Sequence, residues 1–395
     1  MFYGITSKVK KYIVNQDILL GSNSSQSKYF CKEISKFSKV MLVTGKSSYE
    51  LSGAKDFMNS ILKDKEVIIF NNFDVNPDID QINPGYNIAK EKKPDAIIAV
   101  GGGSVIDAAK IVHHMYCNNI SEKEILLNKI NNSSKFLKYI PFVAIPTTAG
   151  TGSESTHFAV LYKNKKKFSI ASERMLPSMV YLDHNLCLSN TAYQNACSGF
   201  DAMAQAIESY WSKSSTILSR IYSKKAINLI LDNFSNVVLE PKKNDSNMLN
   251  MLIASNYAGK AINITKTTAP HALSYGITQN LGLPHGHAVA LTLGAFFNFN
   301  NLELKKNNLV INKQLKNFKN IEKIFINKIG FNPSDFLYEL MINFSMEYDF
   351  NKLGLGEEMI DGIVKNINLE RLQNHPISLN ANQLKNTFYL VPNKN

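Results

Sequence analysis

Long apolar runs are missing from the sequence. No stretch approaches the roughly 18–20 uninterrupted apolar residues that a membrane-spanning helix needs, so we expect no membrane partner. The first residues, MFYGITSKVKKYIV, carry charges where a secretory signal peptide would need an apolar segment. We therefore expect a cytoplasmic protein.

Cysteine is also scarce. The sequence has 4 cysteines, scattered along the chain without CxxC spacing. Disulfide frameworks and cysteine metal sites need regularly spaced cysteines, so we expect neither.

Acidic residues are outnumbered, with 32 Asp and Glu against 44 Lys and Arg, which gives a net charge of +12. The excess lysine is spread among asparagine and isoleucine, as in LELKKNNLVINKQLKNFKN, and no arginine-rich stripe occurs. A nucleic-acid-binding surface would concentrate the charge, so we interpret the charge as a compositional bias and expect no nucleic-acid partner. Steering of an anionic substrate remains compatible with it.

Short β-branched runs alternate with helical spacing over the first 185 residues. The predicted strands are continuous apolar runs, as in parallel sheets buried on both faces, at residues 39–45, 66–70, 95–100 and 140–146. Helical spacing lies between them at residues 49–62 and 79–92. The pattern predicts an α/β dinucleotide-binding domain at residues 1–185, with a doubly wound sheet.

Strand-like runs disappear after about residue 186. Segments such as TAYQNACSGFDAMAQAIESYWS and NMLNMLIASNYAGKAINI have apolar residues at helical spacing. We predict an all-helical second domain at residues 186–395, consistent with a chain too long for a typical single core.

Two glycine-rich stretches follow successive predicted strands. In AVGGGSVIDAAK, the glycines Gly101, Gly102 and Gly103 would let backbone N–H groups approach a pyrophosphate at the start of the next helix. A purely structural tight turn is the alternative. The second stretch, PTTAGTGSEST, has hydroxyls and small residues that suit a nucleotide, so we predict a nucleotide site at this edge of the sheet.

Three of the 8 histidines lie in HALSYGITQNLGLPHGHAVAL. His271 and His285 are separated by a glycine and a proline that break any single helix, so we expect them on two converging segments. We expect Asp201 to open the DAMAQAIESYW helix, with Gln205 one turn later on the same face. Each residue alone is more often a cap or a packing group. Together, one carboxylate and two imidazoles predict an open site for a divalent metal acting as a Lewis acid.

The chain resembles the group III, iron-dependent alcohol dehydrogenases, relatives of glycerol dehydrogenase and dehydroquinate synthase. DAIIAVGGGSVIDAAK, IPTTAGTGSEST, GFDAMAQAIESYWS and HALSYGITQNLGLPHGHAVAL stand in the family's order and spacing. The resemblance implies a dehydroquinate synthase-like fold, NAD(P)H as cofactor, a bound Fe2+ or alternatively Zn2+, and a homodimer.

The resemblance also implies residue roles. The implied cofactor contacts are Gly102, Gly103, Ser104, Asp107, Thr147, Thr148, Thr151 and Ser153. The implied metal ligands are Asp201, His271 and His285; with Gln205, either the metal is held by these three residues plus a weak fourth or the preferred metal has changed. Gln205 stands where most members have a histidine, and Tyr275 stands where most have another histidine, four residues after His271. A neutral amide oxygen binds iron or zinc more weakly than imidazole does.

Cofactor choice depends on LVTGKSS. Gly45 follows a strand end where relatives that prefer NAD tend to carry an acidic residue for the ribose 2′-OH. Without an acidic side chain beside Lys46 and Ser47, nothing there repels the 2′-phosphate of NADPH. We therefore expect NADPH to be used at least as well as NADH.

Within the family, QAIESYWS with TKTTAPHALSY resembles the phosphonoacetaldehyde reductase branch, which implies reduction of phosphonoacetaldehyde to 2-hydroxyethylphosphonate. The metal would polarise the carbonyl, the nicotinamide would deliver hydride, and Tyr275 or a water relay would supply the proton. Alternative functions are a generalist primary alcohol dehydrogenase, a sulfoacetaldehyde reductase and an inactive nucleotide-binding relative.

Candidates for holding a small anionic aldehyde are Lys266 and Thr267, which precede His271, and His157, which is also a catalytic candidate. The alternatives are a solvated lysine at position 266 and a packing histidine at position 157.

Overall fold

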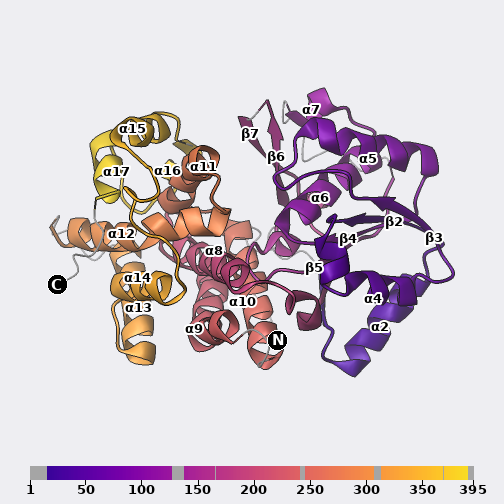
Figure 1. Ribbon diagram of the computed structural model, residues 1–395, viewed down its shortest axis with the longest axis horizontal. Coiled ribbons are helices and arrows are strands. Elements are labelled where there is room, and N and C mark those ends of the chain that lie inside the picture. The colour runs from indigo at the N-terminus through magenta and orange to yellow at the C-terminus, as the bar shows by residue number, and fades with distance from the viewer. Residues whose placement is uncertain are drawn as a thin grey trace, which may run out of the picture. The chain divides into compact units, whose positions relative to one another are not determined.

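The computed structural model describes residues 16–126, 138–164, 166–240, 245–306, 313–367 and 369–389. The chain divides into two compact units (Figure 1). Unit 1 comprises Met1–Thr148 and Ser153–Ser189, and unit 2 comprises Ala149–Gly152 and Asn190–Asn395. The boundary expected at residue 186 lies four residues before the start of the main part of unit 2. Among the described helices, none combines the length and the apolar character that crossing a membrane requires.

Unit 1 is built on a six-stranded sheet in which all neighbouring strands are parallel. The strand order is β1-β8-β5-β4-β2-β3. The strands are β1 (Asp17–Leu20), β2 (Lys39–Thr44), β3 (Glu66–Phe70), β4 (Ala96–Gly101), β5 (Phe142–Pro146) and β8 (Met179–Leu182). All four predicted strands are present within two residues of their expected ends. The four-residue strands β1 and β8 and the antiparallel hairpin of β6 (Phe158–Lys163) and β7 (Lys166–Ala171) were not predicted.

Helices cover both faces of this sheet (Figure 1). Met41 and Val43 of β2 pack in one apolar cluster with α5 (Ile79–Lys92) and α6 (Gly103–Asn118). Val40 and Leu42 pack in the other with α2 (Ser24–Ser35) and α4 (Ala54–Ile61). Successive strand residues point to opposite faces, so each cluster receives every second residue. A strand that packs into both clusters therefore needs apolar residues at every position. The predicted doubly wound sheet is confirmed.

The helix predicted at residues 49–62 is instead two helices, α3 (Ser48–Leu51) and α4. Gly53 between them has a φ of 74°, a left-handed conformation that interrupts a right-handed helix. Unit 1 also contains α7 (Glu122–Leu126) and three short 3-10 turns, η1 (Ser153–Ser155), η2 (Glu173–Met175) and η3 (His184–Cys187).

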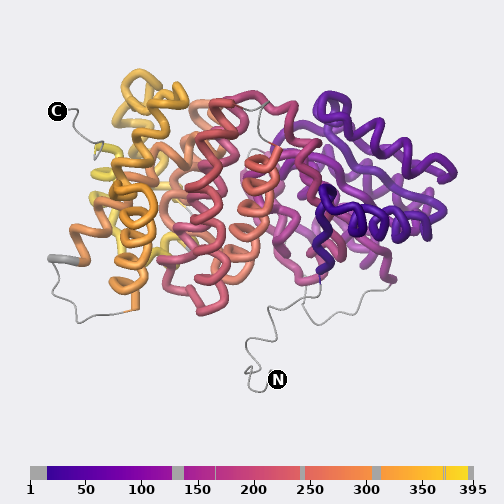
Figure 2. Tube along the Cα trace, turned by 90° about the horizontal axis from the view of Figure 1, so that it is seen from below, coloured from indigo at the N-terminus to yellow at the C-terminus, as the bar shows by residue number. Residues whose placement is uncertain are grey.

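Unit 2 contains helices and no strand within its described residues. The helices are α8 (Ala192–Trp211), α9 (Ile217–Leu239), α10 (Asp245–Thr265), α11 (Ala269–Leu281), α12 (His285–Lys306), α13 (Lys313–Ile329), α14 (Pro333–Asn343), α15 (Glu357–Lys365), α16 (Leu369–Gln373) and α17 (Ala381–Thr387). Helix α8 packs against α9, α10 and α12, and Figure 2 shows the long helices of this unit side by side. The predicted helical C-terminal region is confirmed.

Asp201 does not open its helix, so that expectation is wrong. Thr191 begins α8 with a capping box, in which its side chain accepts from the Gln194 N–H and the Gln194 side chain accepts from the Thr191 N–H. Asp201 therefore lies near the middle of α8, among residues that are buried on nearly every side.

Candidate active site

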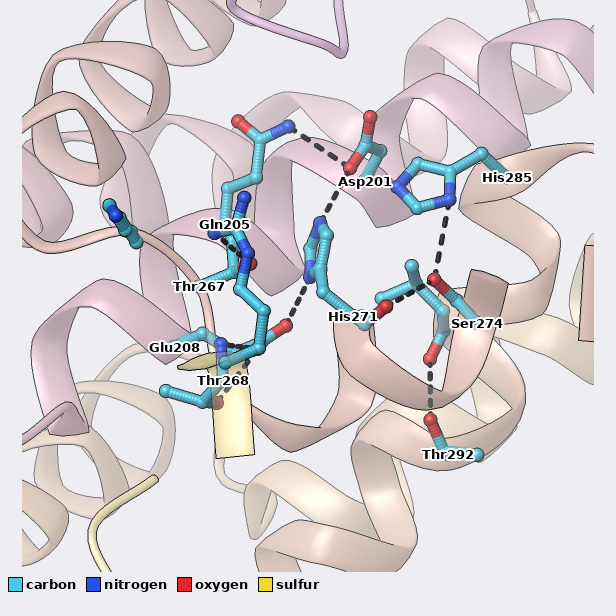
Figure 3. Close-up of polar contacts among 12 residues, drawn as sticks. Asp201, Gln205, Glu208, Thr267, Thr268, His271, Ser274, His285 and Thr292 are labelled. Atoms are coloured by element: carbon cyan, nitrogen blue, oxygen red, sulfur yellow. Dashed lines mark hydrogen bonds and ion pairs between the residues drawn. The ribbon is translucent and has the colours of Figure 1, made fainter. Parts of the chain in front are cut away.

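Asp201, His271 and His285 converge in unit 2 (Figure 3). Asp201 lies on α8, His271 in the first turn of α11 and His285 at the start of α12. One ligand atom from each side chain lies within 4.8 Å of the other two. The predicted break between the histidines is present, because α11 ends at Leu281 and Gly282 follows with a φ of 67°. The structure thus brings together the three residues predicted as strong metal ligands.

A glycine lets the start of α12 approach α8 closely. A Cβ placed on Gly286 would lie 1.8 Å from the backbone oxygen of Cys197, which belongs to α8. Backbone cannot move away as a flexible side chain can, so any larger residue at position 286 would displace α12. This close approach brings the start of α12, and with it His285, next to the helix that carries Asp201.

Glu208 holds His271 from the side opposite Asp201. It lies on α8, seven residues after Asp201, and its side chain is fully buried. Its carboxylate accepts hydrogen bonds from Thr268 N at 2.6 Å, from Thr268 Oγ1 at 2.7 Å and from His271 Nδ1. Because Nδ1 donates to Glu208, His271 presents Nε2 to Asp201 Oδ1, 3.2 Å away. Sequence reasoning missed Glu208, although residues seven apart on a helix share a face.

The two buried carboxylates favour positive charge at this point. Burial alone would lower the pKa of His271, but Glu208 and the hydrogen bond with Asp201 raise it to about 9. Burial alone would raise the pKa of Asp201, but the hydrogen bond from His271 and the charges of His285 and His271 hold it below its usual value. The cluster therefore stabilises a cation between its members.

His285 is oriented by Ser274. The Ser274 hydroxyl donates its single hydrogen to the backbone oxygen of His271 at 2.8 Å and lies 3.3 Å from His285 Nδ1. With that hydrogen committed, His285 Nδ1 must donate to Ser274, so Nε2 carries the lone pair. Figure 3 shows this second ring nitrogen facing Asp201. Tyr275 stacks on the His285 ring, with centroids 5.7 Å apart and planes at 15°.

These residues fit a divalent metal. Once a metal takes the place of the His271 Nε2 proton and both imidazoles are neutral, two ring nitrogens and one carboxylate oxygen can direct lone pairs to one point, a donor set that suits Fe2+ and Zn2+. Two ligand atoms each about 2.1 Å from one tetrahedral ion lie roughly 3.4 Å apart. The 3.2 Å between His271 Nε2 and Asp201 Oδ1 is close to that separation.

Gln205 turns its amide nitrogen to the cluster. Nε2 donates to Asp201 Oδ1 at 3.0 Å (Figure 3) and to the backbone oxygen of Thr151 at 3.1 Å. Its Oε1 is buried and has no hydrogen-bond partner among the described residues. Turning the amide over would bring Oε1 against two acceptors, so ligation of a metal by Gln205 stays a prediction. Thr151, predicted to contact the cofactor, belongs to unit 2.

The glycine-rich loops of unit 1 follow neighbouring strands. Gly102 caps α6 directly after β4, and Thr147, after β5, donates its N–H to the backbone oxygen of Gly101 at 3.1 Å. A Cβ on Gly102 would lie 3.5 Å from the Thr148 side chain, so the two loops are in contact range. Ser104 accepts at Oγ from Asn76 N at 3.1 Å.

This edge of the sheet is its topological switch point. From β2 the chain adds β3 on one side, then crosses over to add β4 and β5 on the other. Ligands of doubly wound folds bind at the carboxyl ends of the strands where the order reverses. Gly45 and Lys46 follow β2, while Gly103 and Ser104 open α6 after β4. These four residues therefore lie at the edge where doubly wound folds bind their ligands, and their contacts with a cofactor stay predictions.

Asp74 is an acidic residue at this edge of the sheet, and it was not predicted from the sequence. Lys46 Nζ is 3.1 Å from Asp74 Oδ1, and both side chains are exposed. Gln81 Nε2 donates to the other Asp74 oxygen at 2.7 Å. Asp74 follows β3 and not β2, so the local pattern after β2 could not reveal it.

Asp107 and Ser153 take part in a buried network around Lys110. The Asp107 carboxylate accepts from Ser153 Oγ and from Val160 N, the latter at 2.8 Å. Lys110 is fully buried and donates to Ser153 Oγ at 3.1 Å and to Thr156 Oγ1 at 2.9 Å. Burial lowers the pKa of Lys110 to about 8, against the opposing charge of Asp107. The network ties α6 to η1 and β6, and the cofactor roles of Asp107 and Ser153 stay predictions.

The predicted substrate residues differ in exposure. His157 belongs to unit 1, where its ring meets Phe158 edge-on at 5.7 Å. Lys266 is exposed and directly follows α10, with a φ of 60°. Thr267 is 2% exposed, and its Oγ1 accepts from Arg371 Nη1 at 2.7 Å. Arg371 was missed because it lies 104 residues further along the chain.

The chain is similar in sequence to known proteins. Family models described as "Iron-containing alcohol dehydrogenase" and "Fe-containing alcohol dehydrogenase family, C-terminal" match residues 15–184 and 195–389. A phosphonoacetaldehyde reductase of Streptomyces viridochromogenes is 32% identical over 213 residues, 53% of this chain and 54% of that protein. Aldehyde-alcohol dehydrogenase 2 of Entamoeba histolytica is 28% identical over 293 residues, 70% of this chain and 33% of that protein.

The chain thus spans about a third of the length of the aldehyde-alcohol dehydrogenases that it matches. Among solved structures, the sulfoacetaldehyde reductase of Bifidobacterium kashiwanohense in complex with NAD+ is similar with a TM-score of 0.82. The two sequences are 26% identical, and the match covers 95% of this chain and 97% of that one.

Proposed function

Because this chain belongs to the iron-containing alcohol dehydrogenase family, we propose that it reduces a small anionic aldehyde to a primary alcohol with NAD(P)H. The substrate that we propose first is phosphonoacetaldehyde, with 2-hydroxyethylphosphonate as the product. The observation that carries the proposal is the convergence of Asp201, His271 and His285 on one point. Two similar proteins, by their names, reduce aldehydes that carry a phosphonate or a sulfonate.

The metal site would act on the aldehyde oxygen. A divalent metal held by Asp201, His271 and His285 would supply a Lewis acid that stabilises negative charge as it develops on that oxygen. With a metal in place of the Nε2 proton, Glu208 would keep the Nε2 lone pair of His271 directed to the metal, and Ser274 would do the same for His285. In unit 1, Gly102, Gly103 and Ser104 would hold the cofactor pyrophosphate at the N-terminus of α6.

Tyr275 is our proposed source of the proton that completes the alcohol. Burial raises the pKa of its hydroxyl, and the opposing charge of Arg371 does not cancel that rise. A phenol with a raised pKa stays protonated at neutral pH, so Tyr275 Oη can donate a hydrogen bond or a proton. The stacking on His285 holds the ring beside the proposed ligands. Proposed substrate contacts for His157, Lys266 and Thr267 belong to the same scheme.

The test is a substrate panel on protein loaded separately with Fe2+ and Zn2+. Phosphonoacetaldehyde, sulfoacetaldehyde and propanal are compared with NADPH and with NADH. We expect kcat/KM for phosphonoacetaldehyde to exceed that for propanal at least about tenfold, equal to about 1.4 kcal/mol of transition-state binding. Asp201→Ala should lose both bound metal and activity, whereas full activity in the chelator-treated variant would contradict a metal-dependent reaction.

Other outcomes identify the alternatives. A preference for sulfoacetaldehyde would favour the function named for the structural relative, which matches over 95% of this chain. A preference for propanal would indicate a generalist alcohol dehydrogenase. A metal-loaded protein that reduces none of the aldehydes would indicate an inactive nucleotide-binding relative. We also propose a cytoplasmic homodimer, which light scattering and cell fractionation would test.

A further inference from the structure

An arginine lies beside the candidate metal cluster. Arg371 is on α16, which packs against α11, the helix that carries His271. Its Nη1 donates to Thr267 Oγ1 at 2.7 Å, and Thr267 is four residues before His271. The guanidinium therefore reaches the segment that leads directly into one of the proposed metal ligands.

Tyr275 interacts both with Arg371 and with His285, the second proposed histidine ligand. It lies four residues after His271, and its ring stacks on His285. The charge of Arg371 and a hydrogen bond with Thr267 both act on the Tyr275 hydroxyl and lower its pKa against the larger effect of burial. The guanidinium of Arg371 and the hydroxyls of Thr267 and Tyr275 thus interact with one another, and the ring of Tyr275 stacks on one of the proposed metal ligands.

The segment that follows α16 is hydrogen-bonded to the connection between α10 and α11. Asn374 Nδ2 donates to the backbone oxygens of Thr265 and Thr267, at 2.7 Å and 3.0 Å. Thr265 ends α10 and Thr267 precedes α11, so this amide fixes the connection between the two helices. A group held by packed helices keeps its geometry better than one on a loose surface loop.

Arginine is a rare cation in this lysine-rich chain. The sequence has 44 Lys and Arg residues, of which three, Arg174, Arg220 and Arg371, are arginines. Lysine is a compact point charge, whereas the planar guanidinium presents a fork of donors that matches two oxygens of a tetrahedral oxyanion. In a chain so rich in lysine, an arginine beside the cluster suits recognition of such a group.

We propose that Arg371, with the hydroxyls of Thr267 and Tyr275, forms the subsite that receives the phosphonate or sulfonate group of the substrate. The inference rests on the proposed function and names the residues that select an anionic aldehyde over a neutral one. Lys266, the anion partner expected from the sequence, is exposed at the end of α10, so Arg371 is the better-placed cation.

The alternative is that Arg371 only ties α16 to the turn before α11. A purely structural arginine would affect every substrate equally when it is replaced. An anion-binding arginine would affect the anionic substrate and anionic inhibitors more than a neutral aldehyde. Comparing the two kinds of ligand on the same variant therefore separates the roles.

The experiment uses full-length, metal-loaded protein with Arg371→Gln and Arg371→Lys. Lys224→Gln, on the exposed side of α9, is the control for loss of one positive charge in unit 2. For each protein, kcat/KM is measured with phosphonoacetaldehyde and propanal, and methylphosphonate is tested as an inhibitor. Thermal unfolding is recorded to compare the stability of the variants.

In Arg371→Gln we expect kcat/KM for phosphonoacetaldehyde to fall by about 10- to 100-fold, the effect of losing a charge-assisted hydrogen bond. The loss with propanal should be at least about tenfold smaller, and inhibition by methylphosphonate should weaken in parallel. Arg371→Lys should recover part of the loss, and Lys224→Gln should match the wild type.

Equal losses with both aldehydes, or unchanged inhibition by methylphosphonate in Arg371→Gln, would overturn the subsite while leaving the proposed function in place. If Arg371→Gln does not fold, the same comparison on Arg371→Lys decides, because equal effects there would overturn it too. A wild type that prefers propanal and ignores methylphosphonate would overturn the proposed function, and the subsite with it.

Discussion

Exchanging Glu208 for glutamine should weaken metal binding although Glu208 is not itself a proposed ligand. The carboxylate accepts from Thr268 N, Thr268 Oγ1 and His271 Nδ1, whereas glutamine has one oxygen and adds two donors of its own. At least one of these donors would lose its acceptor, and His271 would lose the charge that directs its Nε2 lone pair. The packing volume would barely change.

The size of the effect can be estimated in two ways. Replacing the partner of a metal-bound histidine typically costs about 10- to 100-fold in metal affinity, or about 1.4–2.7 kcal/mol. Loss of a hydrogen bond to a charged group costs about 1.5–3 kcal/mol. The two estimates agree, so we expect the Kd of Glu208→Gln to rise by about 10- to 100-fold.

The assay is competition with a chromogenic chelator, for Zn2+ in air and for Fe2+ without oxygen. Ser209→Ala is the matched control, because Ser209 is the next residue on α8, is fully buried and accepts from Thr265 Oγ1 at 2.9 Å. Its loss should lower the unfolding temperature and leave the metal Kd within about threefold. An unchanged Kd in Glu208→Gln, or an equal rise in Ser209→Ala, would refute the role of Glu208.

Three further predictions concern other parts of the chain. Gln205→His should retain or tighten metal binding in the same chelator assay, because imidazole is a stronger ligand than an amide; a weaker affinity for the metal would contradict this. NADPH should be used at least as well as NADH, and Asp74→Asn, which frees Lys46 from its ion pair, should increase the preference for NADPH; a kcat/KM more than about tenfold higher with NADH would count against it. Burial lowers the pKa of His113 to about 4 and of His375 to about 3, so the unfolded chain takes up protons below about pH 6.5 while the folded chain does not. The stability that these two histidines contribute should be fully present above that pH and fall by up to about 1.4 kcal/mol per pH unit for each histidine between pH 6.5 and 4, and a urea midpoint that does not move over this range would show the reasoning to be wrong.

The sequence by itself determined the features that depend on neighbours along the chain. Uninterrupted apolar runs predicted the central parallel strands, because a strand covered on both faces needs apolar residues at every position. The glycines after β4 predicted the turn into α6, and Gly282 with Pro284 predicted that His271 and His285 lie on separate helices. Residue type then sufficed to propose a metal, since carboxylate and imidazole are its usual ligands.

Only the tertiary structure decided which groups support and extend the cluster. Glu208 meets Thr268 across 60 positions of the sequence, and Arg371 meets Thr267 across 104. No local pattern records such pairs, because helix packing and the turns between helices determine which residues meet. The direction of the Gln205 amide was equally undetermined, because it depends on acceptors from two other places in the chain, Asp201 and the backbone of Thr151. A hydrogen bond depends on distance and angle in space, and the fold sets both.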